Sequence, residues 1–362
     1  MPNQGESSAV RVAVVGAGYW GPNIIRNLQE NEDCELVAVC DRDTQKLGLV
    51  GKRFKNALKL VPDFDQLLND QTLDAVAIVT EINSHYALAK AALEAGKHVF
   101  VEKPLATTPE QCLALGQLAE QVQKTLMVGH TFIYNPAVRE LKNIAMSGDL
   151  GDIFYMHAQR LNLGRIQTNI NSLWSLAVHD VAIALYLFDE RPTWVHAWGN
   201  DFITPGVADV SFLNIQFPSG RLANIHTSWL DPEKKRQVTL VGSKKMAVYD
   251  DVSLDRKITL YDKGIDKVLV DSPMAEYKDF SEFQLLTRTG DVSIPHLNFT
   301  EPLKVEMQHF MDCIKGKVKT PLTSWREGYA VVKVLEAAQR SLDFSGIPVE
   351  LTWEESEAHA AL

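Results

Sequence analysis

The stretch that decides the fold is Arg11-Val-Ala-Val-Val-Gly16-Ala-Gly18-Tyr-Trp-Gly21. A β-branched run breaks here into a Gly-x-Gly-x-x-Gly pattern and continues as the helical pattern of residues 23–28. In such a unit the first glycine permits a tight turn, the second lets the backbone approach a pyrophosphate, and the third lets helix and strand pack closely. The helix N-terminus offers N–H groups to the anion. The stretch therefore predicts a dinucleotide-binding Rossmann unit.

An acidic residue after the next strand supports this interpretation. The apolar strand predicted at residues 35–40 ends at Asp41, 20 residues beyond Gly21, where a carboxylate can accept hydrogen bonds from a ribose 2′-OH. Because a 2′-phosphate would meet this carboxylate, we expect NAD rather than NADP as the cofactor. The neighbouring Arg42 weakens that expectation.

The first third of the chain alternates between strand and helix patterns. Strands are predicted at residues 75–79, 98–101 and 126–128, and helices at 85–95 and 110–123. This order predicts a doubly wound parallel sheet, in which ligands bind beyond the carboxyl ends of the strands. The glycine loop, the loop at 80–85 and the corner at 102–104 should then face one crevice. The expected cofactor-binding residues are Gly16, Gly18, Tyr19, Trp20, Gly21, Asp41, Arg42, Thr80, Glu81, His85, Glu102 and Lys103.

The second half has a different pattern. A helix at 136–147 and a strand at 152–163 precede successive strand-like runs from 193 to 270, and helices at 301–314 and 325–342 follow. Within 211–217, apolar and polar residues alternate, as in a sheet with one buried face. We therefore predict an α/β plus α+β protein, with a Rossmann domain at 9–131 and, at 132–362, a domain whose open, mostly antiparallel sheet is flanked by helices.

Composition limits the class of protein. A chain of 362 residues favours two domains, and a formal charge of −10 argues against non-specific binding to nucleic acid or to an anionic membrane. The four cysteines are scattered without a CxxC pair or a histidine cluster, so neither a metal site nor a disulfide framework is indicated. The longest apolar run, at 181–188, is too short to span a bilayer. We expect a cytoplasmic protein with reduced thiols.

Three motifs carry a family resemblance. Gly16–Gly21, the stretch Gly96-Lys-His-Val-Phe-Val-Glu102-Lys103-Pro104 and the stretch Trp174-Ser-Leu-Ala-Val-His179-Asp180 resemble the Gfo/Idh/MocA oxidoreductases, over nearly the whole chain. The segments at 129–136, 160–164 and 242–246 are similar to the branch that oxidises nucleotide-linked sugars at C3. The resemblance implies an NAD-dependent enzyme that forms homodimers or homotetramers through its C-terminal sheets.

Two residues of these motifs suit alcohol oxidation. Removing a hydroxyl proton while hydride leaves the same carbon requires a base and a donor that stabilises charge on oxygen, and Lys103 and His179 can share these roles. Pro104 restricts the backbone of Lys103, although the sequence leaves the peptide isomer open. The alternatives are a surface lysine at a strand end and a satisfied core histidine in the apolar helix around 178–188.

Two positions depart from the family pattern. Many family members have Asp four residues before the histidine, on the same helical face, where this chain has Ser175. Relatives often have Pro where this chain has Glu81. The proton relay would then depend on Lys103 and His179 alone or on a water held by Ser175.

A polar cluster between the 152–163 strand and the His179 helix suits a sugar, a carboxylate or a diphosphate. A solvated loop is the alternative for each member. The predicted substrate-binding residues are Lys103, His130, Tyr134, Asn135, Arg160, Asn162, Arg165, Gln167, Asn171, Ser175 and His179. The run Lys234-Lys235-Arg236 could steer a diphosphate, but we favour a solvated turn.

The function that these patterns favour is NAD-dependent oxidation of the C3 hydroxyl of a UDP-linked sugar, N-acetylglucosamine or its uronate. A dehydrogenase of a free sugar or inositol is the first alternative. A non-catalytic NAD-binding regulator is the second, and the retention of both Lys103 and His179 counts against it.

Overall fold

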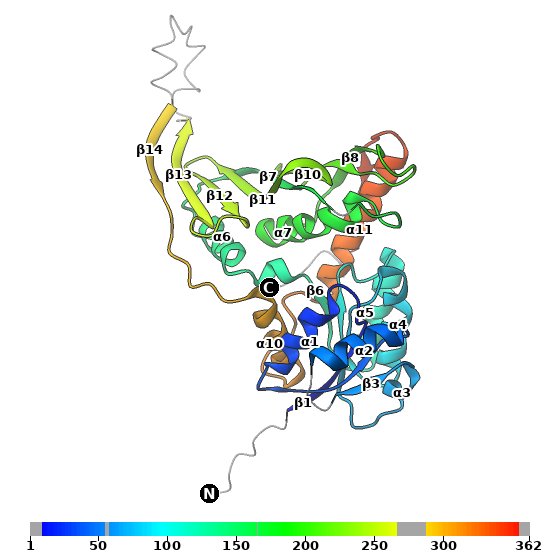
Figure 1. The fold of residues 1–362 in the computed structure, drawn as a ribbon. Coiled ribbons are helices and arrows are strands. Elements are labelled where there is room, and N and C mark those ends of the chain that lie inside the picture. The colour runs from blue at the N-terminus through cyan, green and yellow to red at the C-terminus, as the bar shows by residue number, and fades with distance from the viewer. Residues whose placement is uncertain (1–8, 55–57, 165, 266–286, 355–362) are drawn as a thin grey trace, which may run out of the picture. The chain divides into compact units, whose positions relative to one another are not determined.

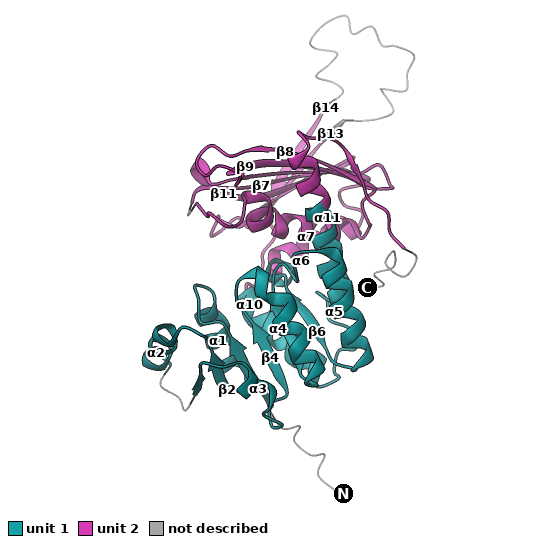
Figure 2. Ribbon diagram, turned by 90° about the vertical axis from the view of Figure 1, so that its right-hand side faces the viewer, with its two compact units in different colours: residues 1–134, 300–336, 359–362 teal, residues 135–299, 337–358 magenta. Residues whose placement is uncertain are grey.

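The computed structural model describes residues 9–54, 58–164, 166–265 and 287–354. The chain divides into two compact units, which are coloured separately in Figure 2. Unit 1 comprises residues 1–134, 300–336 and 359–362, and unit 2 comprises residues 135–299 and 337–358. Each unit is therefore assembled from segments that lie far apart in the sequence.

Unit 1 contains the predicted parallel sheet. Its strands are β1 (Val10–Val15), β2 (Cys34–Cys40), β3 (Lys59–Val61), β4 (Ala75–Ile78), β5 (His98–Glu102) and β6 (Leu126–Gly129). They are all parallel, in the order β3-β2-β1-β4-β5-β6. This is the doubly wound order of dinucleotide-binding folds. The predicted fold class is confirmed for this unit.

Helices connect these strands. They are α1 (Gly21–Gln29), α2 (Thr44–Arg53), α3 (Asp65–Leu68), α4 (Ile82–Glu94) and α5 (Pro109–Gln121). All four residues of β4 are buried, as expected for a parallel strand covered on both faces. The Asp43 side chain caps α2 and Thr108 caps α5, which fixes where each helix begins.

The C-terminal helices contribute to unit 1 as well. The short 3₁₀ helix η1 (Thr131–Tyr134) is followed, far along the chain, by α10 (Pro302–Ile314) and α11 (Trp325–Asp343). Phe310 of α10 packs on Phe100 of β5, with ring centroids 5.9 Å apart. Gly116 of α5 leaves room for the Trp325 ring, which any side chain at 116 would strike. Residues 300–336 thus complete the core of the Rossmann unit. The predicted division into residues 9–131 and 132–362 places these residues in the second domain instead.

Unit 2 is built on a nine-stranded sheet in the order β14-β13-β12-β11-β7-β10-β9-β8-β15. The strands are β7 (Ile153–Leu163), β8 (Trp194–Asn200), β9 (Val210–Gln216), β10 (Leu222–Ser228), β11 (Leu230–Gly242), β12 (Met246–Asp250), β13 (Ile258–Ile265), β14 (Thr287–Ser293) and β15 (Val349–Glu350). Among the strand pairs of the described residues, β7–β10 alone is parallel. The prediction of an open, mostly antiparallel sheet is confirmed.

Helices α6 (Pro136–Met146) and α7 (Val178–Phe188) lie on one face of this sheet, and Figures 1 and 2 show no described helix across the other face. The five residues before α7, Leu173–Ala177, form a π-helix. The sequence predicted an ordinary helix through this stretch. Ser175 therefore lies in a π-helical turn, and His179 lies in the α-helix that follows it.

No described helix combines the length and apolar character needed to cross a membrane. The cysteines Cys34, Cys40, Cys112 and Cys313 are free thiols. Burial raises the pKa of the Cys40 thiol to about 11, so it stays protonated at neutral pH.

Candidate active site

The glycine loop of unit 1 has the backbone that a pyrophosphate requires. Gly16 has a φ of 108°, and a Cβ there would lie 2.6 Å from the carbonyl oxygen of Val79. A Cβ at Gly21 would strike the carbonyl of Gly16, whereas one at Gly18 would meet nothing within 4 Å. The first and third glycines are therefore fixed by packing, and the second leaves open space beside the backbone.

Asp41 is held at the carboxyl end of β2 by the backbone around it. Its Oδ2 accepts a hydrogen bond from the N–H of Ala17 at 2.7 Å, and its Oδ1 accepts one from the N–H of Asp43 at 2.9 Å. The carboxylate is thus tied directly to the glycine loop. The neighbouring Arg42 is exposed, as are Tyr19 and Trp20 within the loop.

The loop after β4 is tied to the corner after β5. His85 is buried in α4, with its Nδ1 2.8 Å from the carbonyl oxygen of Pro104 and its Nε2 3.0 Å from that of Thr80. Burial lowers the pKa of His85, so the neutral ring donates to one of these carbonyls at a time. Glu81 is exposed at the start of α4. This places Thr80 and Glu81 at the carboxyl edge, whereas His85 links the two loops from within the core.

The corner after β5 contains a buried carboxyl group. The Glu102 side chain accepts a hydrogen bond from the N–H of Lys103 at 3.2 Å and one from the Trp20 side chain. Burial raises the pKa of Glu102 to about 7, although the nearby Lys103 charge lowers it. Lys103 follows this strand directly, and the peptide bond between Lys103 and Pro104 is cis.

Two further titratable groups lie beside Glu102. Gly129 pairs with Glu102 across β5 and β6, and a Cβ on Gly129 would lie 3.2 Å from the Glu102 carboxyl carbon. His130 comes next in the chain, and the hydroxyl of Thr131 donates to Glu306 Oε2 of α10 at 2.7 Å. We call the carboxyl groups of Glu102 and Glu306, together with the buried ring of His130, the buried carboxyl cluster.

Burial shifts the pKa of each member of the buried carboxyl cluster toward its neutral form. Burial raises the pKa of Glu306 well above its usual value, and the Glu102 charge raises it further, while burial lowers the pKa of His130 to about 3. Glu102 Oε1, Glu306 Oε1 and both ring nitrogens of His130 have no hydrogen-bond partner among the described residues. Buried polar atoms are normally paired, so these point to a ligand or to solvent at this edge.

In unit 2, His179 is the second residue of helix α7 and is more exposed than the residues on either side of it. Every residue of Val178–Phe188 is buried except His179 and Tyr186. The next residue, Asp180, is 1% exposed and forms a bidentate ion pair with Arg160 of β7, at 2.7 Å from Nε and 2.9 Å from Nη2. The Arg160 side chain, predicted to bind substrate, is therefore engaged in anchoring the first turn of α7.

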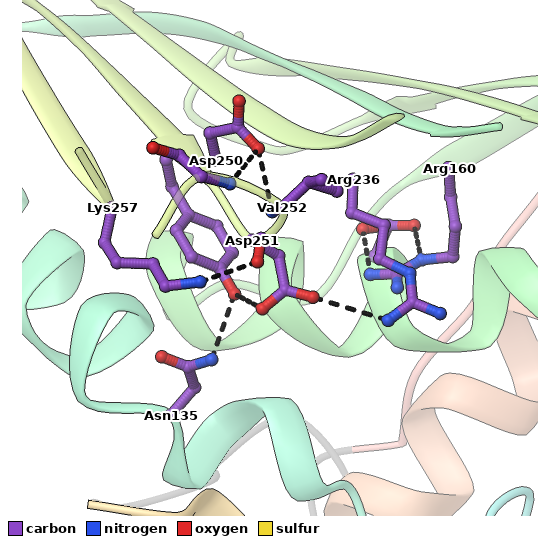
Figure 3. A network of polar contacts seen from close by, with 10 residues as sticks. Asn135, Arg160, Arg236, Asp250, Asp251, Val252 and Lys257 are labelled. Atoms are coloured by element: carbon purple, nitrogen blue, oxygen red, sulfur yellow. Dashed lines mark hydrogen bonds and ion pairs between the residues drawn. The ribbon is translucent and has the colours of Figure 1, made fainter. Parts of the chain in front are cut away.

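A second polar network, around Asp251, lies beside this ion pair, as Figure 3 shows. The Tyr249 hydroxyl donates to Asp251 Oδ1 at 2.9 Å and accepts a hydrogen bond from the Asn135 side chain at 3.0 Å. Arg236 approaches Asp251 Oδ2 at 3.4 Å, and Lys257 donates to the Asp251 backbone carbonyl at 2.6 Å. Asn135 also caps α6, so both polar ends of its side chain are occupied.

The other predicted substrate residues have varied surroundings. Gln167 donates to the Ser175 hydroxyl at 3.1 Å, which brings these two candidates together. Asn171 instead caps the turn that leads to Trp174 and donates to Gln339 of α11 at 2.8 Å. Tyr134 is fully buried with its hydroxyl 3.0 Å from that of Thr323. Asn162 packs beside Gly164, and Arg165 lies outside the described residues.

Some residues of these clusters escaped the sequence analysis. Lys234 and Lys235 are exposed, as the interpretation of a solvated turn expects, but Lys234-Lys235-Arg236 lies within strand β11 and not in a turn. The sequence pattern does indicate that Glu306 is buried, because it stands three residues after Leu303 and four before Phe310, on the apolar face of α10. Tyr249 and Asp251 left no comparable signal.

Unit 1 combines the doubly wound strand order, the glycine loop with open space at Gly18, and the fixed Asp41 carboxylate. Together with the unpartnered Glu102 oxygen, these features fit an NAD-binding oxidoreductase. Residues 10–130 match the oxidoreductase family with an NAD-binding Rossmann fold, and residues 138–248 match the GFO/IDH/MocA C-terminal domain. The chain belongs to the Gfo/Idh/MocA family, which confirms the resemblance, the enzyme class and the NAD cofactor.

Individual relatives are similar at low identity. The uncharacterized oxidoreductase YrbE of Bacillus subtilis is 24% identical over 95% of this chain and 97% of its own length. The UDP-N-acetylglucosamine 3-dehydrogenase of Acidithiobacillus ferrooxidans is 26% identical over 72% of this chain and 79% of its own length. The WlbA dehydrogenase of Bordetella pertussis, solved with NADH and UDP-GlcNAcA, superposes with a TM-score of 0.76 at 18% identity, over 96% of this chain and 100% of that one. This last likeness concerns the fold alone.

Proposed function

We propose that this protein oxidises the C3 hydroxyl of a UDP-linked sugar, N-acetylglucosamine or its uronate, with NAD as oxidant. The observation that carries the proposal is the Glu102-Lys103-Pro104 corner, which puts a lysine immediately after a buried strand at the carboxyl edge of the NAD-binding sheet. The similarity to a UDP-N-acetylglucosamine 3-dehydrogenase supports the substrate class. The segments at 129–136 and 160–164 support the same branch.

Each residue of the site has a role in this proposal. Gly18 and the α1 N-terminus hold the pyrophosphate, Asp41 accepts the adenosine ribose hydroxyls, and Glu102 accepts those of the second ribose. When bound, NAD supplies a hydride acceptor for the carbon that is oxidised. Lys103 and His179 divide between them the removal of the hydroxyl proton and the stabilisation of charge on the reacting oxygen.

Substitution of the two proposed catalytic residues tests this division. Lys103→Ala and His179→Ala are each expected to lower kcat by roughly 10²–10⁴-fold while NAD binding survives. The lysine substitution should be the more damaging, because its charge also polarises the oxygen. The double variant should be little worse than the worse single one, since the two act as a unit. Near-normal kcat in a folded Lys103→Ala protein would remove the assignment.

A panel of nucleotide sugars and free polyols, assayed for NAD reduction by the unmodified protein, tests the substrate. Turnover confined to free sugars or inositol would favour the first alternative. Inactivity on every compound, with NAD bound, would favour a regulator built on the same fold.

We also propose that the open face of the unit 2 sheet pairs with a second copy of the chain. Trp198 and Phe212 are cross-strand neighbours on this face and both are exposed. Phe212 stacks on His226, and a hydrogen-bonded ladder of His157, Asn224 and Asn214 runs beside them. An exposed aromatic patch with a polar border is typical of an interface. Light scattering that shows only monomers at micromolar concentration would contradict this.

A further inference from the structure

Two arginine side chains stand directly opposite each other in the sheet of unit 2. Arg236 of β11 is the register partner of Arg160 of β7. Like charges in this arrangement destabilise a sheet. Such a local conflict is expected at functional sites rather than at sites selected for stability alone.

The two guanidinium groups differ in how well their charges are compensated. Arg160 makes two short bonds to Asp180, and its side chain is 7% exposed. The Arg236 side chain is 41% exposed, and its ion pair with Asp251 is long, at 3.4 Å. The Asp251 carboxylate in turn accepts the Tyr249 hydroxyl. Arg236 is therefore the member of the pair that a ligand can reach and recruit.

A third cation lies on the other side of Asp251. Lys257 directs its ammonium to the Asp251 backbone carbonyl rather than to a carboxylate, and Figure 3 shows Lys257 and Arg236 on opposite sides of this aspartate. The group formed by Arg160, Arg236 and Lys257 with Asp180 and Asp251 thus contains three cations and two carboxylates. Asp251 also lies close enough to Arg160 to raise the pKa of its guanidinium.

We propose that Arg236, supported by Lys257, binds an anionic group of the substrate, either the diphosphate or a sugar carboxylate. The inference rests on the proposed function only for the identity of the ligand. The planar guanidinium fork of Arg236 matches both oxyanions. Its strand lies beside β7, whose Arg160 anchors the turn of α7 that carries His179.

The test is calorimetric binding of four anions to the full-length protein saturated with NADH, so that no sugar is oxidised during the titration: inorganic pyrophosphate, UDP, UDP-N-acetylglucosamine and its uronate. Arg236→Gln should weaken binding by about 10–100-fold, the usual range for a charge-assisted contact. Weaker binding of pyrophosphate and UDP assigns the diphosphate to Arg236. Weaker binding of the uronate alone assigns the sugar carboxylate. The matched control is Lys235→Gln on the same strand, whose side chain is 46% exposed and pairs with Glu233; its effect should be under about twofold.

A second variant separates ligand binding from a structural role. Asp251→Asn retains an oxygen for the Tyr249 hydroxyl but removes the charge that competes for Arg236, so it should tighten anion binding severalfold. A merely structural aspartate would give unchanged or weaker binding.

Several outcomes overturn the inference. They are wild-type affinity in Arg236→Gln for all four anions, an equal loss in Lys235→Gln, and no binding of any anion by the unmodified protein. If the protein binds these anions through Arg236 but oxidises no nucleotide sugar, the anion site stands and the proposed function fails.

Discussion

The two polar clusters of this protein manage buried charge in opposite ways. In unit 2, Arg160 and Asp180 form a buried ion pair that two hydrogen bonds hold together. In unit 1, Glu306 has no such ion pair with a described residue, and burial raises the pKa of its carboxyl well above the usual value, which favours the protonated form. The first arrangement fixes a helix. The second leaves acceptors available to a ligand, and it contains carboxyl groups with raised pKa values.

The largest expected effect on stability comes from breaking the buried ion pair of Arg160 and Asp180. Asp180→Asn leaves the Arg160 charge buried without its counter-ion, and we expect a loss of about 3–5 kcal/mol in the free energy of unfolding. Urea denaturation measures it. The control is Glu190→Gln, which breaks the more exposed pair with Arg221 at 2.9 Å and should cost less than about 1 kcal/mol. Equal losses in the two variants would contradict the contrast between buried and exposed pairs.

Neutralising Glu306 of the buried carboxyl cluster should have the opposite effect and raise the free energy of unfolding. Because the folded-state pKa of Glu306 is raised, the folded protein keeps a proton that the unfolded chain releases above its ordinary pKa of 4.5. The wild type therefore loses stability as pH rises from about 4.5 toward the folded-state pKa. Glu306→Gln keeps an acceptor for Thr131 and does not titrate, so its stability relative to wild type should rise with pH, reaching about 1–3 kcal/mol at alkaline pH.

Unfolding free energies of Glu306→Gln and wild type at pH 5, 7 and 9 provide the measurement. Glu94→Gln, at an exposed position of α4, controls for the loss of one carboxylate. A difference between Glu306→Gln and wild type that stays constant over this range would show that Glu306 is not protonated in the folded state.

A smaller effect links the buried carboxyl cluster to the cofactor. With the pKa of Glu102 at about 7, most of this carboxyl is ionised at pH 8 and most is protonated at pH 6. Ionised carboxylates accept hydroxyl hydrogen bonds more strongly, so the Kd for NAD should rise about tenfold from pH 8 to pH 6. Calorimetry should show a flatter profile for Glu102→Gln. A pH-independent Kd in the wild type would exclude Glu102 as the titrating group.

Most of the fold could be predicted because its signals are local. The glycine loop, the alternation of strands and helices, and the period of two in 211–217 each reflect a few neighbouring residues. The π-helix at Leu173–Ala177 could not be predicted, since it depends on packing around one inserted turn. The return of residues 300–336 to unit 1 likewise depends on contacts such as Phe310 on Phe100.

In the candidate site, too, the residues within local motifs could be predicted, whereas their interactions with residues distant in the sequence could not. Residues in motifs, such as Asp41 and Lys103, lie at the strand ends where the sequence put them. Other charged neighbours are distant in the sequence: Glu306 interacts electrostatically with Glu102, and Asp251 with Arg160, and the members of each pair are more than 90 residues apart. Pairing decides whether a charged side chain binds ligand or holds structure, and for Arg160 only the three-dimensional position of Asp180 reveals it.

The smallest expected effect concerns cofactor selectivity, and it tests whether a carboxylate fixed by backbone contacts repels a phosphate. Asp41 is oriented by the N–H groups of Ala17 and Asp43, so its charge cannot swing away from a 2′-phosphate. The exposed Arg42 beside it offsets part of that repulsion. We expect NAD to bind more tightly than NADP. Asp41→Ala should narrow this preference by about 3–10-fold, the worth of a lost hydrogen bond to the 2′-OH.

Asp41→Asn separates the loss of a hydrogen bond from the loss of charge repulsion, because it keeps an acceptor for the Ala17 N–H but removes the charge. It should improve NADP binding with a smaller loss of NAD binding. Arg42→Ala should widen the preference again. Calorimetric Kd values for both cofactors decide the matter, and equal or tighter binding of NADP by the wild type would show that Arg42, not Asp41, controls this end of the site.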